Sequence, residues 1–141
     1  MKHVAWAGVM LGLLLAVPPN VVAQQDRPTK PVRLLKNYPN PFKFETTIPF
    51  ELDQGMFTSG HRPVVSMRIY NVLAQLVAIP ISTGSGVPLN EIKLTWNGTG
   101  RYSAYWDGKI LGTDRDAASG VYVYQLVVDD DQLTKRMTMV K

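Results

Sequence analysis

The chain has 141 residues and a formal net charge of +4, from 15 lysines and arginines against 11 acidic residues, and it contains no cysteine. The basic residues are spread along the whole sequence without a continuous run, so the charge excess does not predict a nucleic-acid-binding surface. Because no disulfide can form, the burial of apolar side chains must hold the fold together.

The first 23 residues have the pattern of a secretory signal peptide. A basic start at residues 1–3 leads into an apolar stretch at residues 4–17, and a small residue, Ala23, precedes the expected cleavage point. The apolar stretch is shorter than the roughly 20 residues that cross a bilayer, which favours cleavage over a retained membrane anchor. We therefore expect an exported protein with no stable membrane insertion after the signal peptide is removed.

The remainder of the chain has the pattern of one domain behind a short lead-in. Residues 24–33 are polar, contain Pro28 and Pro31, and are expected to be flexible. Residues 34–141 show short apolar runs broken by turn residues, without a sustained helical period. They predict an all-β fold, an immunoglobulin-like antiparallel β-sandwich of about seven strands.

Three strands are expected in the first half of this domain. Residues 46–52 and residues 64–70 alternate apolar and polar side chains, so each strand buries one face. Pro49 has no amide N–H to give to a neighbouring strand, which predicts a place at a sheet edge. After a turn at residues 71–75, residues 76–81 continue as the third strand.

A first hairpin is expected around an Asn97-Gly98 turn. Residues 92–96 and residues 102–106 alternate apolar and polar positions on either side of it. An Asn-Gly pair favours the positive φ angles of a tight turn. A polar loop then leads to the second hairpin.

The second hairpin joins residues 121–128 to residues 133–141 through an aspartate-rich turn, residues 129–131. On its first strand, Tyr122 and Tyr124 share a face with other apolar residues. Their rings are expected to cover the sheet and to keep their hydroxyls near water.

The sequence shows no arrangement typical of an active site. His61 is the one histidine outside the expected signal peptide, and no cysteine ligand set or glycine-rich phosphate loop is present. We therefore expect no enzyme and no cofactor. Asp114, Asp116 and residues 129–131 carry the oxygen ligands that calcium prefers, but a solvated acidic turn is the favoured interpretation.

Five ordered stretches carry a resemblance to a known family: residues 37–42, 69–77, 106–108, 118–126 and 135–141. They resemble the C-terminal sorting domain of type IX secretion substrates and are similar to the immunoglobulin-like domain of the flagellar hook-capping protein. The residues that match the family motifs are Pro39, Asn40, Pro41, Tyr70, Trp106, Asp107, Gly108, Ser119, Gly120, Tyr122 and Tyr124.

The chain departs from the family pattern in a longer loop at residues 82–101 and at one turn. The family usually has a glycine followed by a basic residue there, whereas this chain has Ala74 and Gln75. Because alanine is strained at positive φ, we expect a different turn type. Only the short lead-in stands where the family usually carries a larger cargo.

The resemblance implies a non-catalytic module that passes through the periplasm and is recognised by outer-membrane secretion machinery for delivery to the cell surface or medium. The expected contact surface is the final strand, because an edge strand can be bound by strand addition. The alternative, to which we give equal weight, is that this strand only completes the sandwich. The expected contact residues are Lys135, Arg136, Met137, Met139 and Lys141.

Two other functions are left open. The near-absence of cargo favours a structural subunit of a surface or hook-related assembly, in which the chain self-associates. Alternatively, aromatic residues of the first expected hairpin would bind carbohydrate: Trp96, Tyr102, Tyr105 and Trp106. Their alternation points Tyr105 outward and the other three rings toward the core, which makes this alternative the weaker one.

Overall fold

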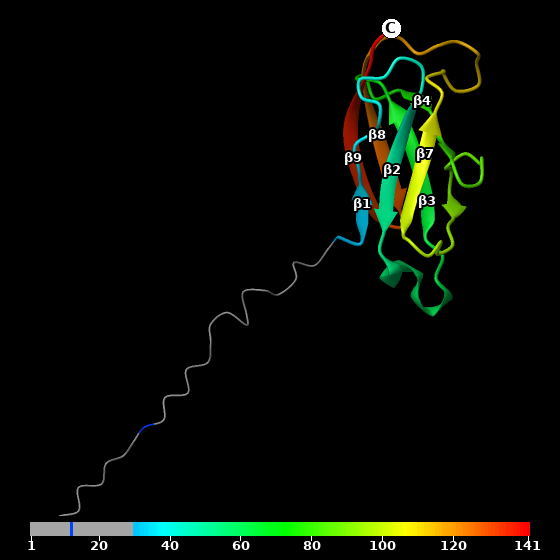
Figure 1. Cartoon of the computed structure of the whole chain (residues 1–141). Coiled ribbons are helices and arrows are strands. Elements are labelled where there is room, and N and C mark those ends of the chain that lie inside the picture. Colours follow the sequence, from blue (N-terminus) through cyan, green and yellow to red (C-terminus); the bar gives the residue numbers. More distant parts are fainter. Residues whose placement is uncertain (1–11, 13–29) are drawn as a thin grey trace, which may run out of the picture.

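Two antiparallel sheets pack face to face in the computed structural model, which describes Gly12 and residues 30–141 (Figure 1). The expected signal peptide, apart from Gly12, and residues 24–29 of the expected lead-in lie outside these residues. Within the described part, the chain forms nine strands and one short 3-10 helix. No helix in this part is both long enough and apolar enough to span a membrane.

The first sheet has the strand order β1-β2-β7-β5. Its strands are β1 (Val32–Leu34), β2 (Thr46–Leu52), β7 (Arg101–Trp106) and β5 (Ile81–Ser82). Val32 is buried and pairs with Leu52. The expected lead-in therefore extends too far, because its last two residues already belong to β1.

The second sheet has the order β4-β3-β8-β9, and β6 also pairs with β3. Its strands are β4 (Leu76–Ala78), β3 (Val64–Tyr70), β8 (Gly120–Val128), β9 (Asp131–Met139) and β6 (Ile92–Lys93). The helix η2 (Gln54–Gly60) connects β2 to β3 at one end of the sandwich (Figure 1).

The core lies between the two sheets and follows the predicted alternation. Every second residue of β2 is buried, as is every second residue of β8 from Tyr122 onward. Each large apolar side chain removed from water stabilises the fold by about 1.5–3 kcal/mol before opposing entropy. The largest fully buried side chains are Trp106, Tyr124, Phe50, Ile48, Met67, Ile69, Leu89, Leu126, Met137, Met139, Val65 and Val128.

The prediction that Pro49 places its strand at a sheet edge is wrong, because β2 lies between β1 and β7. Leu35 N donates to Pro49 O at 3.0 Å, but proline cannot return the second hydrogen bond of such a pair. The hydroxyl of Tyr124 supplies the missing donor to Leu35 O at 2.8 Å. The sheet thus tolerates an interior proline because a side chain from the opposite sheet replaces its amide.

The prediction of one strand at residues 76–81 is also wrong. β4 pairs with β3 in the second sheet, whereas β5 pairs with β7 in the first sheet. The chain crosses from one sheet to the other at Ile79 and Pro80. The apolar alternation continues through the crossing because both segments border the same core.

The hairpin expected around Asn97-Gly98 does not form, because β6 pairs with β3 and β7 pairs with β2 and β5. A tight loop is present nonetheless, with Gly98 at a φ of 89°. Asn97 Oδ1 accepts from Gly100 N at 2.8 Å, and Asn97 Nδ2 donates to Arg101 O at 2.7 Å. The Asn-Gly loop therefore connects two sheets rather than two strands of one hairpin.

The last hairpin is confirmed. β8 and β9 pair from Gly120 with Met139 to Val128 with Asp131, around a two-residue turn at Asp129 and Asp130. The return strand begins two residues earlier than predicted, at Asp131. The structure contains more strands than the predicted seven because several crossing segments form pairs of only two or three residues.

The turn between β3 and β4 does not avoid positive φ, contrary to our expectation. Ala74 has a φ of 60°, in the left-handed region that glycine enters without strain. Asn71 Oδ1 accepts from Leu73 N and from Gln75 N, each at 3.0 Å. The asparagine side chain therefore holds the turn in a shape that alanine disfavours.

Candidate functional site

Most of the residues that match the family motifs lie at the end of the sandwich where β9 finishes. Phe42 N donates to Thr138 O at 3.0 Å, and Val140 N donates to Phe42 O at 2.8 Å. Asn40 Oδ1 accepts from Thr138 N at 3.0 Å. The proline-rich stretch therefore covers the outer edge of the last part of β9.

An aromatic cluster lies beneath this contact. The Trp106 ring meets Phe42 edge-on, with a centroid distance of 5.5 Å, and Tyr122 at 5.4 Å. Trp106 Nε1 donates to Lys109 O at 3.0 Å, which satisfies the indole in its buried position. Phe42 thus anchors the proline-rich stretch in the core, whereas Tyr38, near the start of the stretch, is exposed.

Gly108 allows two segments to approach each other closely at this end. Its φ is 76°, and a Cβ atom there would lie 2.4 Å from Phe44 O and 2.9 Å from Met139 Cε. Asp107 Oδ1 accepts from Lys109 N at 3.0 Å and shapes the turn. The Asp-Gly motif therefore has a steric reason as well as a conformational one.

The end of the chain is tied to the preceding loop. Lys141 N donates to Ser119 Oγ at 3.0 Å, and Lys141 Nζ lies 3.5 Å from Asp116 Oδ2. Lys109 Nζ approaches the other Asp116 oxygen at 3.3 Å. The hydrogen bond from Lys109, followed by the charges of Lys141 and Lys109, lowers the pKa of Asp116.

Tyr124 has a different environment from the one predicted. Its hydroxyl lies in the interior, where it donates to Leu35 O and accepts from Asn37 N at 3.2 Å. Burial raises its pKa, although the hydrogen bond with Asn37 opposes the rise. The Tyr122 hydroxyl donates to Ala118 O. Both tyrosines thus fix backbone segments rather than directing their hydroxyls to water.

The structure separates the five expected contact residues. Met137 and Met139 are only 1 % and 2 % exposed, so their side chains belong to the core. Lys135 is half-buried, while Arg136 and Lys141 are exposed. A folded partner surface can therefore reach the three basic residues but not the two methionines.

The outer edge of β9 is open over its first half. The bonds of Thr138 O and Val140 N to Phe42 show that even-numbered residues direct their backbone groups away from β8. The same alternation turns the backbone groups of Gln132, Thr134 and Arg136 outward. Within the described residues, no strand pairs with this part of the edge, so it offers hydrogen bonds to another chain.

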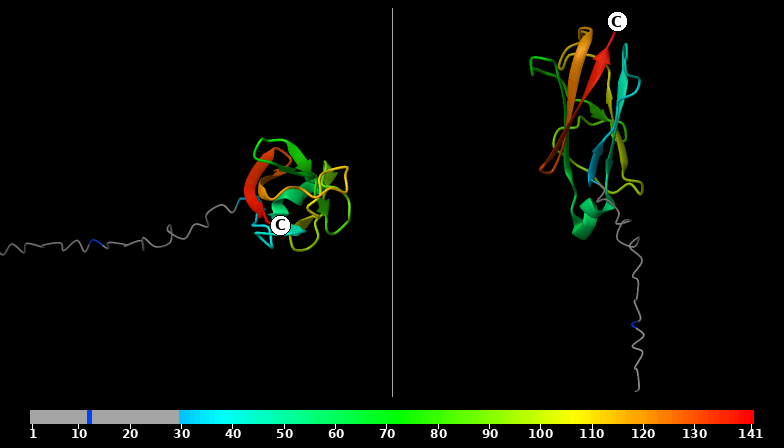
Figure 2. Two further views of the ribbon diagram at one scale, coloured as in Figure 1. Left: turned by 90° about the horizontal axis from the view of Figure 1, so that it is seen from above. Right: turned by 90° about the vertical axis from the view of Figure 1, so that its left-hand side faces the viewer.

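A groove runs between this open edge and β1. Its larger part has a volume of about 390 Å³ and is lined by β1, the residues that follow β1, and the middle of β9. Figure 2 (right) shows this side of the sandwich, with β1 in blue and β9 in red. The basic residues that line it are Lys30, Arg33, Lys36 and Lys135.

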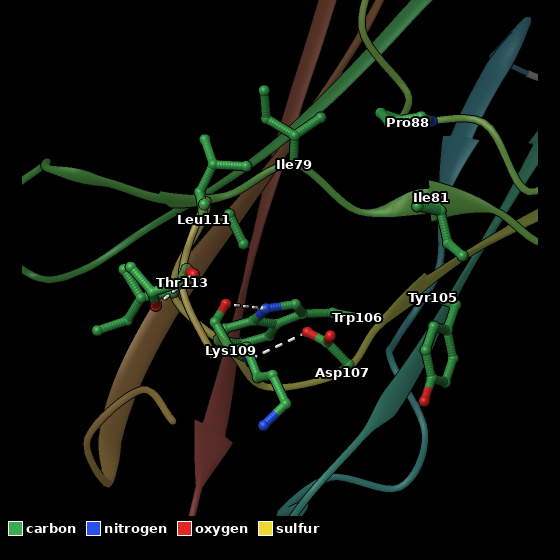
Figure 3. Close-up of a pocket in the computed structure, with 12 residues that line it drawn as sticks. Ile79, Ile81, Pro88, Tyr105, Trp106, Asp107, Lys109, Leu111 and Thr113 are labelled. Atoms are coloured by element: carbon green, nitrogen blue, oxygen red, sulfur yellow. Dashed lines mark hydrogen bonds between the residues drawn. The ribbon is translucent and has the colours of Figure 1, made fainter. Parts of the chain in front are cut away.

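A second hollow, of about 280 Å³, lies beside Tyr105 and Trp106 (Figure 3). Its wall is largely apolar and includes Ile79, Ile81 and Leu111. The Tyr105 hydroxyl donates to Glu45 at 2.6 Å, and this bond raises the pKa of Tyr105 to about 12. The hollow is therefore a shallow apolar depression with Tyr105 at its rim.

The aromatic residues considered for carbohydrate binding are engaged within the protein. Trp106 is buried, Trp96 packs edge-on against Phe57 at 5.4 Å, and Tyr102 stacks on Phe50 at 5.7 Å. Their rings do not combine with that of Tyr105 into one exposed platform.

The acidic residues considered for calcium binding lie apart. Asp129 follows β8, whereas Asp114 and Asp116 precede it. Asp129 accepts from Val64 N at 2.9 Å and contacts His61 Nε2 at 2.8 Å. In the described part of the chain, no three His, Cys, Asp or Glu side chains are grouped so as to hold a metal ion.

Together, the fold and these sites define a β-sandwich module whose last strand is locked at one end and open along a basic groove. Comparison of the chain with protein-family models, with curated proteins and with solved structures gives no match.

Proposed function

We propose that the chain is an exported, non-catalytic immunoglobulin-like module that type IX outer-membrane secretion machinery recognises for delivery to the cell surface or medium. The observation that carries this proposal is the meeting of the motif residues around β9. Asn40, Phe42, Gly108 and Ser119 come from three distant segments, yet each contacts the last strand or the end of the chain.

Such an arrangement supports recognition of the folded end of the sandwich by the secretion machinery, rather than recognition of a short unfolded sequence. The contacts fix β9 while leaving Lys135 and Arg136 accessible. The signal-peptide pattern of residues 1–23 provides the route across the inner membrane. The two packed antiparallel sheets agree with the immunoglobulin-like class that the sequence resembles.

The proposal is tested by following the chain in a bacterium that possesses type IX secretion. We expect surface or medium fractions to contain a chain that begins at Gln24, as determined by mass spectrometry of both ends. Loss of an outer-membrane component of the machinery should leave it in the periplasm. An uncleaved chain in the cytosol, or delivery that does not depend on the machinery, would refute the proposal.

Charge-reversed variants locate the recognition surface. Lys135→Glu combined with Arg136→Glu should reduce delivery, whereas Lys93→Glu, an exposed change on β6, serves as the matched control. Both variants must show the same melting temperature as the parent chain. Equal delivery of the two variants would remove β9 from the recognition surface.

A structural role in a surface assembly is the second candidate, because the open half of β9 can also pair with another copy. In that case the exported chain would be recovered intact in large particles, and variants of the edge would disperse them. Carbohydrate binding has less support, since Trp106 is buried and the half-buried rings of Trp96 and Tyr102 pack against Phe57 and Phe50.

A further inference from the structure

Within residues 30–141, backbone groups on both walls of the groove beside β9 have no hydrogen-bond partner. Leu35 N donates to Pro49 O, and Asp53 N donates to Pro31 O. The backbone groups of odd-numbered residues in and around β1 therefore face β2. The backbone groups of Val32 and Leu34 consequently point away from β2, toward the side of β9 (Figure 2). Across the groove, Thr134 directs its own N–H and C=O outward.

The charge of the larger part of this groove is one-sided. Four cationic side chains line its larger part, and no acidic residue does. Arg33 pairs with Glu51 at 3.1 Å. Within residues 30–141, the remaining cations, Lys30, Lys36 and Lys135, take part in no ion pair.

The groove also has a polarity along its length. Its smaller part, of about 220 Å³, is lined by Asp131 and lies toward the β8–β9 turn. Lys36 and Lys135 line the larger part, and Lys30 lines both parts. The half-buried Leu133 lies between these charged ends, whereas Val32 and Leu34 line the groove with their side chains buried in the core.

We propose that this groove binds an extended acidic peptide segment of a partner protein, which adds as a strand to the open half of β9. The peptide backbone pairs with the outward N–H and C=O of Thr134 and its neighbours. Carboxylates on alternate residues face Lys36 and Lys135, because successive side chains of a strand point to opposite faces. The inference rests on the proposed function only in that it takes β9 as the contact strand.

A second copy of the chain fits this edge less well than an acidic partner. Two β9 strands paired side by side would bring Lys135 and Arg136 of one copy close to the same cations of the other. Like charges on directly opposed strands are destabilising. The partner's negative charge is therefore the complement that the groove selects.

The test uses the full chain and fluorescein-labelled synthetic peptides of about eight residues, the length of an ordinary strand. In the acidic peptide, Glu alternates with Val and Thr. Two control peptides carry Gln or Lys in place of every Glu. By fluorescence anisotropy, we expect the acidic peptide to bind at least about tenfold more tightly than the Gln peptide, with affinity falling as salt is raised.

Two pairs of variants separate strand addition from simple charge attraction. Thr134→Pro removes an outward N–H without removing a bond to β8, and Thr134→Ala is its control. Lys36→Glu with Lys135→Glu reverses the groove charge, and Lys93→Glu is its control. We expect Thr134→Pro and the double charge reversal to weaken binding about tenfold or more, and both controls to stay within about twofold.

Equal binding of the acidic and Gln peptides overturns the inference, as does acidic binding that survives both Thr134→Pro and the double reversal. Should Thr134→Pro fail to fold, the charge reversal alone still decides. Delivery in cells is a separate measurement. Peptide binding without secretion would refute the proposed function and leave the groove assignment intact, while secretion without peptide binding would do the reverse.

Discussion

The β8–β9 hairpin and the segment from β4 to β7 reach the same sandwich by different means. In the hairpin, each residue pairs with a neighbour close in sequence, and distant residues such as Phe42 and Asn37 then fix its position. In the middle segment, the Asn97 side chain shapes its loop locally, yet successive strands change sheets. A local pattern thus determines a turn without determining which sheet receives the next strand.

The contacts that hold the hairpin should be the most sensitive part of the molecule. Gly108→Ala places a methyl group against Phe44 O and forces alanine to a φ of 76°. We expect a loss of about 3 kcal/mol or more in the free energy of unfolding, measured with urea. Gly112→Ala is the control, because Gly112 has a φ of 73° but open space around it. Its loss should be about 1 kcal/mol.

The next effect tests the link between the hairpin and β1. Tyr124→Phe leaves Leu35 O and Asn37 N in the interior without their hydroxyl partner. The free energy of unfolding should fall by about 2 kcal/mol. Tyr70→Phe, whose hydroxyl lies 3.5 Å from Gln125, should change it by less than about 0.5 kcal/mol. Equal losses in the two variants would mean that Tyr124 contributes by packing alone.

In the middle segment, Asn97→Ala should cost about 1 kcal/mol, because its side chain fastens the loop between β6 and β7. Asn97→Asp keeps the acceptor for Gly100 N but loses the donor to Arg101 O, so we expect a smaller loss. In thermal unfolding, the parent chain should be the most stable, Asn97→Asp intermediate and Asn97→Ala the least stable. A larger loss for the aspartate variant would contradict it.

A stabilising change is expected at the other asparagine-shaped turn. Ala74→Gly removes the strain that alanine has at a φ of 60°. The free energy of unfolding should rise by roughly 0.5–1 kcal/mol, seen as a higher melting temperature. Ala118→Gly, an exposed loop position without positive φ, should not stabilise. If both variants lose stability, Ala74 is not strained in solution.

The smallest effect concerns the hairpin turn and depends on pH. Partial burial opposes ionisation of Asp129, but the bonds from Val64 N and His61 outweigh it and hold its pKa below the ordinary value of 3.8. A lowered folded-state pKa gives stability that is present above pH 3.8 and is lost as pH falls through the folded value. Because the carboxylate is partly exposed, we expect about 0.5 kcal/mol. In Asp129→Asn, the free energy of unfolding should fall by that much less than in the parent chain when the pH is lowered below 3.8.

The alternation of side chains predicted the extents of β2 and β3, the buried faces of these strands, and the final hairpin. It could not predict the crossings at Pro80 and Asn97, because an apolar alternation looks the same whichever sheet the strand joins. The edge-strand prediction from Pro49 was wrong for a related reason. The hydroxyl of Tyr124, which replaces the amide donor that proline lacks, stands 75 positions away in the sequence. The resemblance named residues that lie around the end of β9, but the open groove could not be predicted because it depends on the spatial proximity of β1 and β9.

The two ends of the folded body lie at opposite poles. The start of β1 lies close to η2, since Asp53 N, just ahead of that helix, donates to Pro31 O at 2.8 Å. Lys141 lies at the far tip of β9, a strand of about 30 Å (Figure 1). Any passenger fused ahead of residue 30 would therefore hang from one pole and leave the other unobstructed. In such a fusion the sandwich would separate the passenger from the end of β9, so that even a large passenger would leave Lys141 accessible.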